Sequence, residues 1–146
     1  MLRTALVVTA IIFSVTAAAA QSDPVKTRED LMKQNNQHLK TLGNMAKGEE
    51  AFNAAKVNAA FAQWADTAEK IPNLFPDTAK TGGDNRASPK IWENKADFNT
   101  RIAAFAKVIA DNKDKAKDLD GLKAVFPIVS KSCDDCHKPY RLSAQR

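Results

Sequence analysis

The chain has 146 residues, of which 22 are Lys or Arg, 17 are Asp or Glu and 44% are hydrophobic. Such a length suits one globular domain, and the charges alternate without a dense basic run, which argues against nucleic acid as the main partner. Only two cysteines are present, three positions apart, so a disulfide-stabilised scaffold is excluded as well.

The first twenty residues have the layout of a signal peptide. A run of apolar and small residues follows Arg3 and ends at Ala20, after which the chain turns polar. The run is shorter than the roughly 20 residues that a membrane-spanning helix needs, so an uncleaved anchor is the less favoured alternative. We therefore predict a signal peptide over residues 1–20, export to the periplasm, and one mature domain over residues 21–146.

The first half of the mature region predicts two amphipathic helices. Apolar residues recur three and four positions apart from about Pro24 to Lys47 and again from about Glu50 to Lys70. Pro24 suits the start of a helix, and Gly48 suits the end of one. Residues 72–88 contain prolines and paired glycines, which predicts a long irregular crossover.

Two further helices follow the crossover. Ser88-Pro89 is typical of a helix start, and heptad-like apolar spacing continues from there to Ile109. The last helix is expected from about Asp118 to Arg141. The mature region has few glycines, and it has no alternating apolar and polar stretch long enough for a strand. Together with the four helices, this predicts an all-α, antiparallel four-helix bundle.

The last helix contains Cys133-Asp134-Asp135-Cys136-His137, the attachment motif for c-type haem. On a helix, Cys133 and Cys136 lie almost one turn apart and can form thioethers with the two vinyl groups, while His137 binds the iron. Covalent attachment also explains how two cysteines persist in an exported protein, where free thiols normally oxidise. We predict one covalently attached haem c.

Three other interpretations of the motif compete with haem attachment, one of them being chance occurrence of so short a sequence. Zinc could be bound by both cysteines, His137 and His38, but Cys136 and His137 project about 100° apart on a helix, which suits one tetrahedral ion poorly. A thioredoxin-type dithiol belongs at a helix start after a strand, whereas this motif lies late in a helix. Haem attachment is the favoured interpretation.

The motif continues as Cys-x-x-Cys-His-x-x-Tyr-Arg near the C-terminus, which resembles the class II c-type cytochromes, cytochrome c-prime and its low-spin relatives. Arg28-Glu29-Asp30-Leu31-Met32 is similar to that family's Arg-Gln element, and Ser88-Pro89-Lys90-Ile91-Trp92 to its Pro-x-Ile-Trp segment. The resemblance implies that Arg28 pairs with a haem propionate. Glu29 replaces the usual Gln, which puts any propionate contact of that position in doubt.

The resemblance also aligns Met32 with the position that divides the family. An apolar residue there leaves the iron five-coordinate in gas-binding members, whereas a methionine completes six-coordinate, low-spin iron. Met32 is therefore the expected second axial ligand, and a His and Met pair suits electron transfer. The alternative is that Met32 fills the core, as Met45 is expected to do. We leave His38, Trp64 and Trp92 out of the predicted site.

These residues predict a periplasmic carrier of single electrons rather than an enzyme. A gas-binding protein for nitric oxide or carbon monoxide is the alternative, and Met32 argues against it. A peroxidase would need a proton-transferring His or Arg pair on the Met32 face, which the sequence lacks. Lys131, Lys138 and Arg141 would suit an acidic redox partner. The oligomeric state, monomer or homodimer, stays open.

Overall fold

The computed structural model of the chain describes residues 23–81 and 85–143. The predicted signal peptide, residues 1–20, lies outside the described residues. None of the helices in the described ranges combines the length and the apolar character that a membrane crossing requires.

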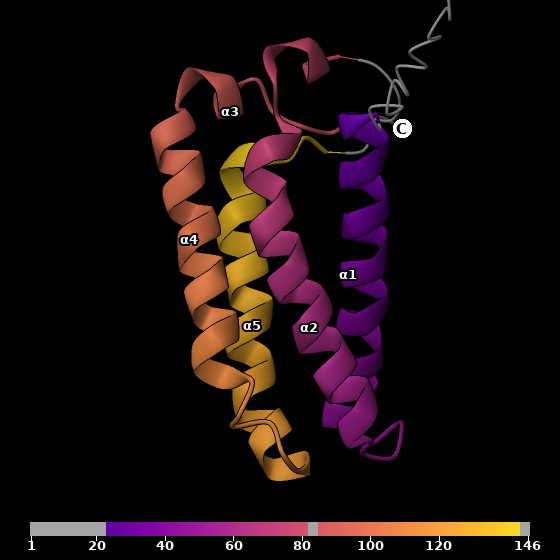
Figure 1. Cartoon of the computed structure of the whole chain (residues 1–146). Helices are drawn as coiled ribbons and strands as arrows, with labels where there is room; N and C mark the ends of the chain where they lie inside the picture. Colours follow the sequence, from indigo (N-terminus) through magenta and orange to yellow (C-terminus); the bar gives the residue numbers. More distant parts are fainter. Residues whose placement is uncertain (1–22, 82–84, 144–146) are drawn as a thin grey trace, which may run out of the picture.

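Four long helices form the body of the molecule (Figure 1): α1 (Pro24–Lys47), α2 (Ala54–Lys70), α4 (Lys95–Asn112) and α5 (Leu119–Tyr140). Each runs antiparallel to the one before it, with α1 and α4 each packed against both α2 and α5. Apart from one isolated bridge between Ala87 and Arg141, the described chain holds no extended pairing. The predicted all-α four-helix bundle is confirmed.

Both ends of α1 lie where the sequence predicts them. The side chain of Asp23 accepts a hydrogen bond of 2.9 Å from the backbone N–H of Val25, which caps the first turn. At the other end Gly48 adopts the left-handed conformation, with φ of 80°, and its N–H donates to the carbonyl oxygen of Met45. A residue without Cβ adopts this conformation at little cost, so the helix stops there.

The predicted start of the second helix near Glu50 is wrong. Helix α2 begins at Ala54, because the side chain of Asn53 accepts a hydrogen bond of 3.0 Å from the N–H of Lys56 and caps the helix there. Asparagine is one of the residues most favoured at the N-cap of a helix, so the helix starts after Asn53 and not at the acidic residues before it.

The third predicted helix is also not continuous. It consists of a single turn, α3 (Lys90–Glu93), followed by α4, and Asn94 separates the two. Asn94 has φ of −136° and its side chain accepts from the N–H of Asp97 at 3.1 Å, so it caps α4. The apolar spacing continues across the break, which is why periodicity alone joined the two helices.

The crossover between α2 and α4 closes the end of the bundle shown at the top of Figure 1. It contains two 3₁₀ turns, η1 (Ile71–Leu74) and η2 (Asp77–Ala79), and α3. After η2 it is tied to the end of α5: the N–H of Ser88 donates to the carbonyl of Tyr140 at 3.0 Å, and the N–H of Leu142 donates to the carbonyl of Arg86 at 2.8 Å. The crossover and the last helix therefore hold each other in place.

The buried apolar residues form two clusters instead of one continuous core. The larger consists of Leu42, Met45, Val57, Ala60, Phe61, Trp64, Ile109, Ala116, Leu122, Val125 and Val129. The smaller consists of Leu31, Ile71, Phe75, Ile91, Phe98, Ile102 and Tyr140. Such burial supplies the main stabilisation of a bundle, at roughly 25 cal/mol per Å² of apolar surface.

Gly121, in the first turn of α5, has no room for a side chain. A Cβ at this position would lie 2.1 Å from the carbonyl oxygen of Lys115, in the loop before the helix. We expect Gly121→Ala to lower the free energy of unfolding by about 1–3 kcal/mol, because the loop backbone must move to relieve the overlap. Urea unfolding followed by circular dichroism measures this. Lys123→Ala, two residues further along the same helix and exposed, is the control, and an equal effect of both variants would contradict the prediction.

Candidate functional site

A cavity of about 590 Å³ lies within the bundle, between the ends of the helices and the crossover. Its walls come from α1, α2, α4, α5 and the crossover, and residues of both apolar clusters contribute to them. The volume is in the range of cavities that hold cofactors and other small molecules. Every long helix therefore contributes to this cavity, which is partly open to solvent.

All five predicted site residues line this cavity, Arg28 among them. Met32 reaches it from α1, and Cys133, Cys136 and His137 reach it from α5. Met32 is 36% exposed, whereas Met45, on the same helix, is fully buried in the larger cluster. Met32 is thus not a core-filling residue, and its side chain lines the same cavity as the haem-attachment motif.

The two cysteines are free thiols with half-buried side chains. Burial raises the pKa of Cys133 to about 11, and the neighbouring Asp134 carboxylate and Cys136 add to the effect. Burial also raises the pKa of Cys136. Both groups are therefore protonated near neutral pH and are poor nucleophiles until they are activated.

His137 favours its neutral form. Burial lowers the pKa of its imidazole, and the positive charges of Arg141 and Arg86 lower it further, against an opposing effect of Asp134. A lowered pKa means that the ring is deprotonated at neutral pH, which is the state in which imidazole binds a metal ion. The environment of His137 therefore suits an axial ligand.

Arg28 lines the cavity but is largely engaged elsewhere. Its guanidinium donates to the carbonyl oxygens of Leu74 at 2.7 Å and Ala79 at 3.2 Å, and to the side-chain oxygen of Asn85 at 3.0 Å. It also lies 4.4 Å from the centre of the Phe75 ring. Arg28 thus holds the crossover against α1, and only its remaining N–H groups are left for the predicted propionate contact.

Trp64 belongs to the cavity wall, although the sequence does not place it in the predicted site. It projects from α2 beside Thr67 and Ala68, which also line the cavity. Trp92, also left out, is not part of the wall, and its indole N–H donates to the carbonyl of Pro76 at 3.2 Å. The inward position of Trp64 was visible in the apolar spacing of its helix, but spacing does not separate core from cavity.

The residues present fit a haem. The wall is mostly apolar, with Phe75, Phe98 and Tyr140 in edge-to-face contact, but it also includes polar side chains such as those of Asn35 and Thr67. Glu29 lines the cavity too, and its Oε1 atom is buried with no hydrogen-bond partner in the described part of the chain. An acceptor without a partner in a cavity wall is expected where an occupant completes the site. A largely apolar cavity, two thiols and an imidazole suit a covalently held porphyrin.

The zinc alternative gains no support. Across residues 23–81 and 85–143, no three side chains of His, Cys, Asp or Glu gather closely enough to hold a metal ion. His38, the proposed fourth ligand, is not among the residues that line the cavity.

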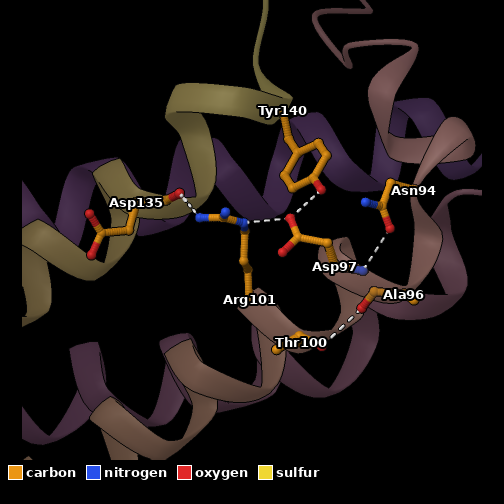
Figure 2. A network of polar contacts seen from close by, with 7 residues as sticks. All are labelled: Asn94, Ala96, Asp97, Thr100, Arg101, Asp135 and Tyr140. Atoms are coloured by element: carbon orange, nitrogen blue, oxygen red, sulfur yellow. Dashed lines mark hydrogen bonds and ion pairs between the residues drawn. The ribbon is translucent and has the colours of Figure 1, made fainter.

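A polar network joins α4 to the end of α5 (Figure 2). The hydroxyl of Tyr140 donates to Asp97 at 2.5 Å, and Nε of Arg101 donates to the same carboxylate oxygen at 2.7 Å. Nη1 of Arg101 donates to the backbone carbonyl of Asp135, inside the attachment motif, at 2.9 Å. The hydrogen bonds from Arg101 and Tyr140 lower the pKa of Asp97, and the bond to Asp97 raises the pKa of Tyr140.

The Tyr140 phenol should therefore titrate above the usual range of a tyrosine. Tyr140 is the only tyrosine of the chain, so ultraviolet difference absorbance during alkaline titration reports on it alone. We expect Asp97→Asn to shift the midpoint down, because a neutral amide no longer favours the protonated phenol. Asp111→Asn removes an exposed carboxylate further along α4 and should leave the midpoint unchanged. A wild-type midpoint at or below the ordinary value for tyrosine would contradict this prediction.

Known proteins resemble this chain over nearly all of its length. The sequence profile described as Cytochrome C' matches residues 23–141. Cytochrome c-556 of Rhodopseudomonas palustris is 41% identical over 145 residues, with 97% of each chain covered. The solved structure of cytochrome c' from the same organism is 38% identical with a TM-score of 0.80, and that of its oxidized cytochrome c556 is 40% identical with a TM-score of 0.76. Both alignments cover 86% of this chain and all of the other.

Proposed function

Because this chain belongs to the cytochrome c' family, we propose that it carries single electrons on one covalently attached haem c, with His137 and Met32 as the two axial ligands of the iron. The haem supplies the chemistry, in which iron alternates between the ferrous and the ferric state. The protein is a c-type cytochrome, and Cys133 and Cys136 are the residues proposed to form the thioethers.

The observation that carries the assignment of ligands is the position of Met32. Its side chain reaches the same cavity as His137 from the opposite helix of the α1 and α5 pair, and it does so without being buried in the core. A thioether and a neutral imidazole that line one slot can bind iron from its two faces. Such a pair favours the ferrous state more than two nitrogen ligands do, and this suits electron transfer.

The other residues of the wall give the site its apolar surface and hold it in place. Trp64, Phe75 and Phe98 present apolar side chains to the cavity, which lowers the dielectric around a charge placed there. Arg28 holds the crossover over the cavity through three hydrogen bonds. A rigid and largely apolar site favours transfer of an electron over chemical change of a substrate. We therefore propose that the protein is an electron carrier and not an enzyme.

Gas binding is the second candidate function. Relatives named cytochrome c' are among the similar proteins, including one of Rhodopseudomonas palustris that is 37% identical over 140 residues. In this reading Met32 leaves the iron open to carbon monoxide or nitric oxide. The cytochrome c-556 relative and the cavity-facing Met32 favour the electron carrier.

Electron carriers of this family act with redox partners, and we propose an acidic partner in the periplasm. Lys138 and Arg141 are exposed beside the attachment motif, and neither forms an ion pair within the described ranges. Lys131 is less available, since its ammonium pairs with Asp135. Export would depend on the predicted signal peptide of residues 1–20, and the protein would act as a monomer or a homodimer.

An optical spectrum of the haem-loaded protein tests this function. We expect sharp low-spin bands in both oxidation states, a methionine-to-iron charge-transfer band in the ferric state, and no response of the ferrous state to carbon monoxide. Broad high-spin bands that shift with carbon monoxide would refute Met32 as a ligand and favour gas binding. A chain that loses its haem in acidified organic solvent would refute covalent attachment.

A further inference from the structure

The haem-attachment segment contains a break in its own helical hydrogen bonding. In an α-helix the carbonyl of residue i accepts from the N–H of residue i+4, and the partner of Asp135 would be residue 139. That residue is Pro139, which has no N–H. The carbonyl of Asp135, between the two cysteines, is therefore left without a partner from its own helix.

Arg101 replaces the missing donor from another helix. Its Nη1 atom lies 2.9 Å from the carbonyl oxygen of Asp135, so α4 completes the hydrogen bonding of α5 at this turn (Figure 2). The guanidinium is held in place for this contact, since its Nε donates to Asp97 at 2.7 Å, and Tyr140 donates to the same carboxylate. The guanidinium carbon also lies 5.8 Å from the centre of the Tyr140 ring.

The position of this contact connects it with the haem. Asp135 lies one residue before Cys136 and two before His137, and both of these line the cavity. A looser turn at Asp135 would let the thioether sulfur and the imidazole change direction together. Charge-assisted hydrogen bonds are stronger than those between neutral groups, which makes an arginine an effective replacement for a backbone N–H.

We infer that Arg101 is a positioning residue for the haem: it supplies the hydrogen bond that Pro139 removes from the attachment turn, and so fixes the direction of Cys136 and His137. The expected effect on the iron rests on the proposed function, in which His137 binds a haem. The hydrogen bond between Arg101 and Asp135 does not depend on it.

The experiment pairs Arg101 with Pro139. Arg101→Leu removes the donor, Pro139→Ala returns the backbone N–H, and the double variant combines them, so that a double-mutant cycle isolates their coupling. Lys107→Leu is the matched control, because Lys107 forms the same kind of i,i+4 ion pair on α4, with Asp111, and within residues 23–81 and 85–143 it has no hydrogen bond to α5. All variants are studied as the haem-loaded protein.

Amide hydrogen exchange of residues 136–138, 140 and 141 is the first measurement, and the ferric absorption bands together with the reduction potential are the second. We expect Arg101→Leu to speed exchange at this turn by about tenfold, as loss of one charge-assisted hydrogen bond implies, and to shift the iron spectrum. Pro139→Ala should restore slow exchange in the Arg101→Leu background. Lys107→Leu should change neither property.

Two results would overturn the inference. The first is that Arg101→Leu changes exchange and spectrum no more than Lys107→Leu does. The second is that amide exchange in the double variant is as fast as in Arg101→Leu alone. If Arg101→Leu accumulates without haem, recovery of attached haem in the double variant supports the inference and its absence refutes it. A wild-type protein with high-spin iron would refute the role of Met32 and leave the exchange result standing. The two proposals can therefore fail separately.

Discussion

Replacing Met32 by leucine is expected to convert the iron from six-coordinate and low-spin to five-coordinate and high-spin. Leucine has a similar volume and no donor atom, so the slot keeps its shape while the thioether ligand is lost. The methionine-to-iron charge-transfer band should vanish completely, the ferrous protein should bind carbon monoxide, and the reduction potential should fall. Absorption spectra, a carbon monoxide titration and a spectroelectrochemical titration measure these three changes.

Met45→Leu is the matched control for Met32→Leu. Met45 lies on the same helix but is fully buried in the larger apolar cluster. The swap should lower the free energy of unfolding by less than about 1.5 kcal/mol and leave the spectrum unchanged. Since Met32 is 36% exposed, its own replacement should change the stability of the haem-free chain by no more than about 0.5 kcal/mol. If Met32→Leu retained low-spin iron, Met32 would not be the ligand.

Replacing both Cys133 and Cys136 by alanine is expected to abolish covalent attachment. With no thiol in the cavity wall, no thioether can form, and any haem that remains is held only by His137 and by apolar contacts. Acidified organic solvent should then extract all of the haem, whereas the wild-type protein should retain all of it. Each single variant should keep one thioether and show the pyridine haemochrome band of a haem with one unreacted vinyl group.

Ser132→Ala is the control for the cysteine variants, because Ser132 is the neighbour of Cys133 and also lines the cavity. Its hydroxyl donates to the carbonyl of Val129, one turn earlier in α5, so the variant loses only a local hydrogen bond. It should keep the haem fully attached. Complete retention of haem by the double alanine variant would contradict the assignment of these cysteines.

The sequence predicted the elements whose ends are determined by local chemistry. Helix α1 begins and ends as expected because Pro24 and Gly48 act on their immediate neighbours. The start of α2 and the break before α4 were missed for a related reason: Asn53 and Asn94 cap the helices, but an asparagine is equally common within loops. Which asparagine caps a helix depends on where the tertiary fold requires the chain to leave the helical conformation.

The site was predictable to the extent that it follows from spacing along one helix. The attachment motif is of this kind, whereas Met32 was singled out by the family resemblance, and the structure brings both to one cavity. The partners of Arg28 in the crossover, and the contact between Arg101 and Asp135, join residues far apart in the sequence. Such contacts depend on the tertiary packing, which hydrophobic periodicity does not specify.

The packing of α1 against α5 sets the order in which the site can form during folding. These helices come from opposite ends of the domain, so their contact closes the longest loop of the bundle and has the largest entropic cost. The neighbours α1 and α2, or α4 and α5, can associate earlier through short connections. The slot between Met32 and the attachment motif should thus be among the last features to form, and a chain waiting for its haem still has both cysteines accessible.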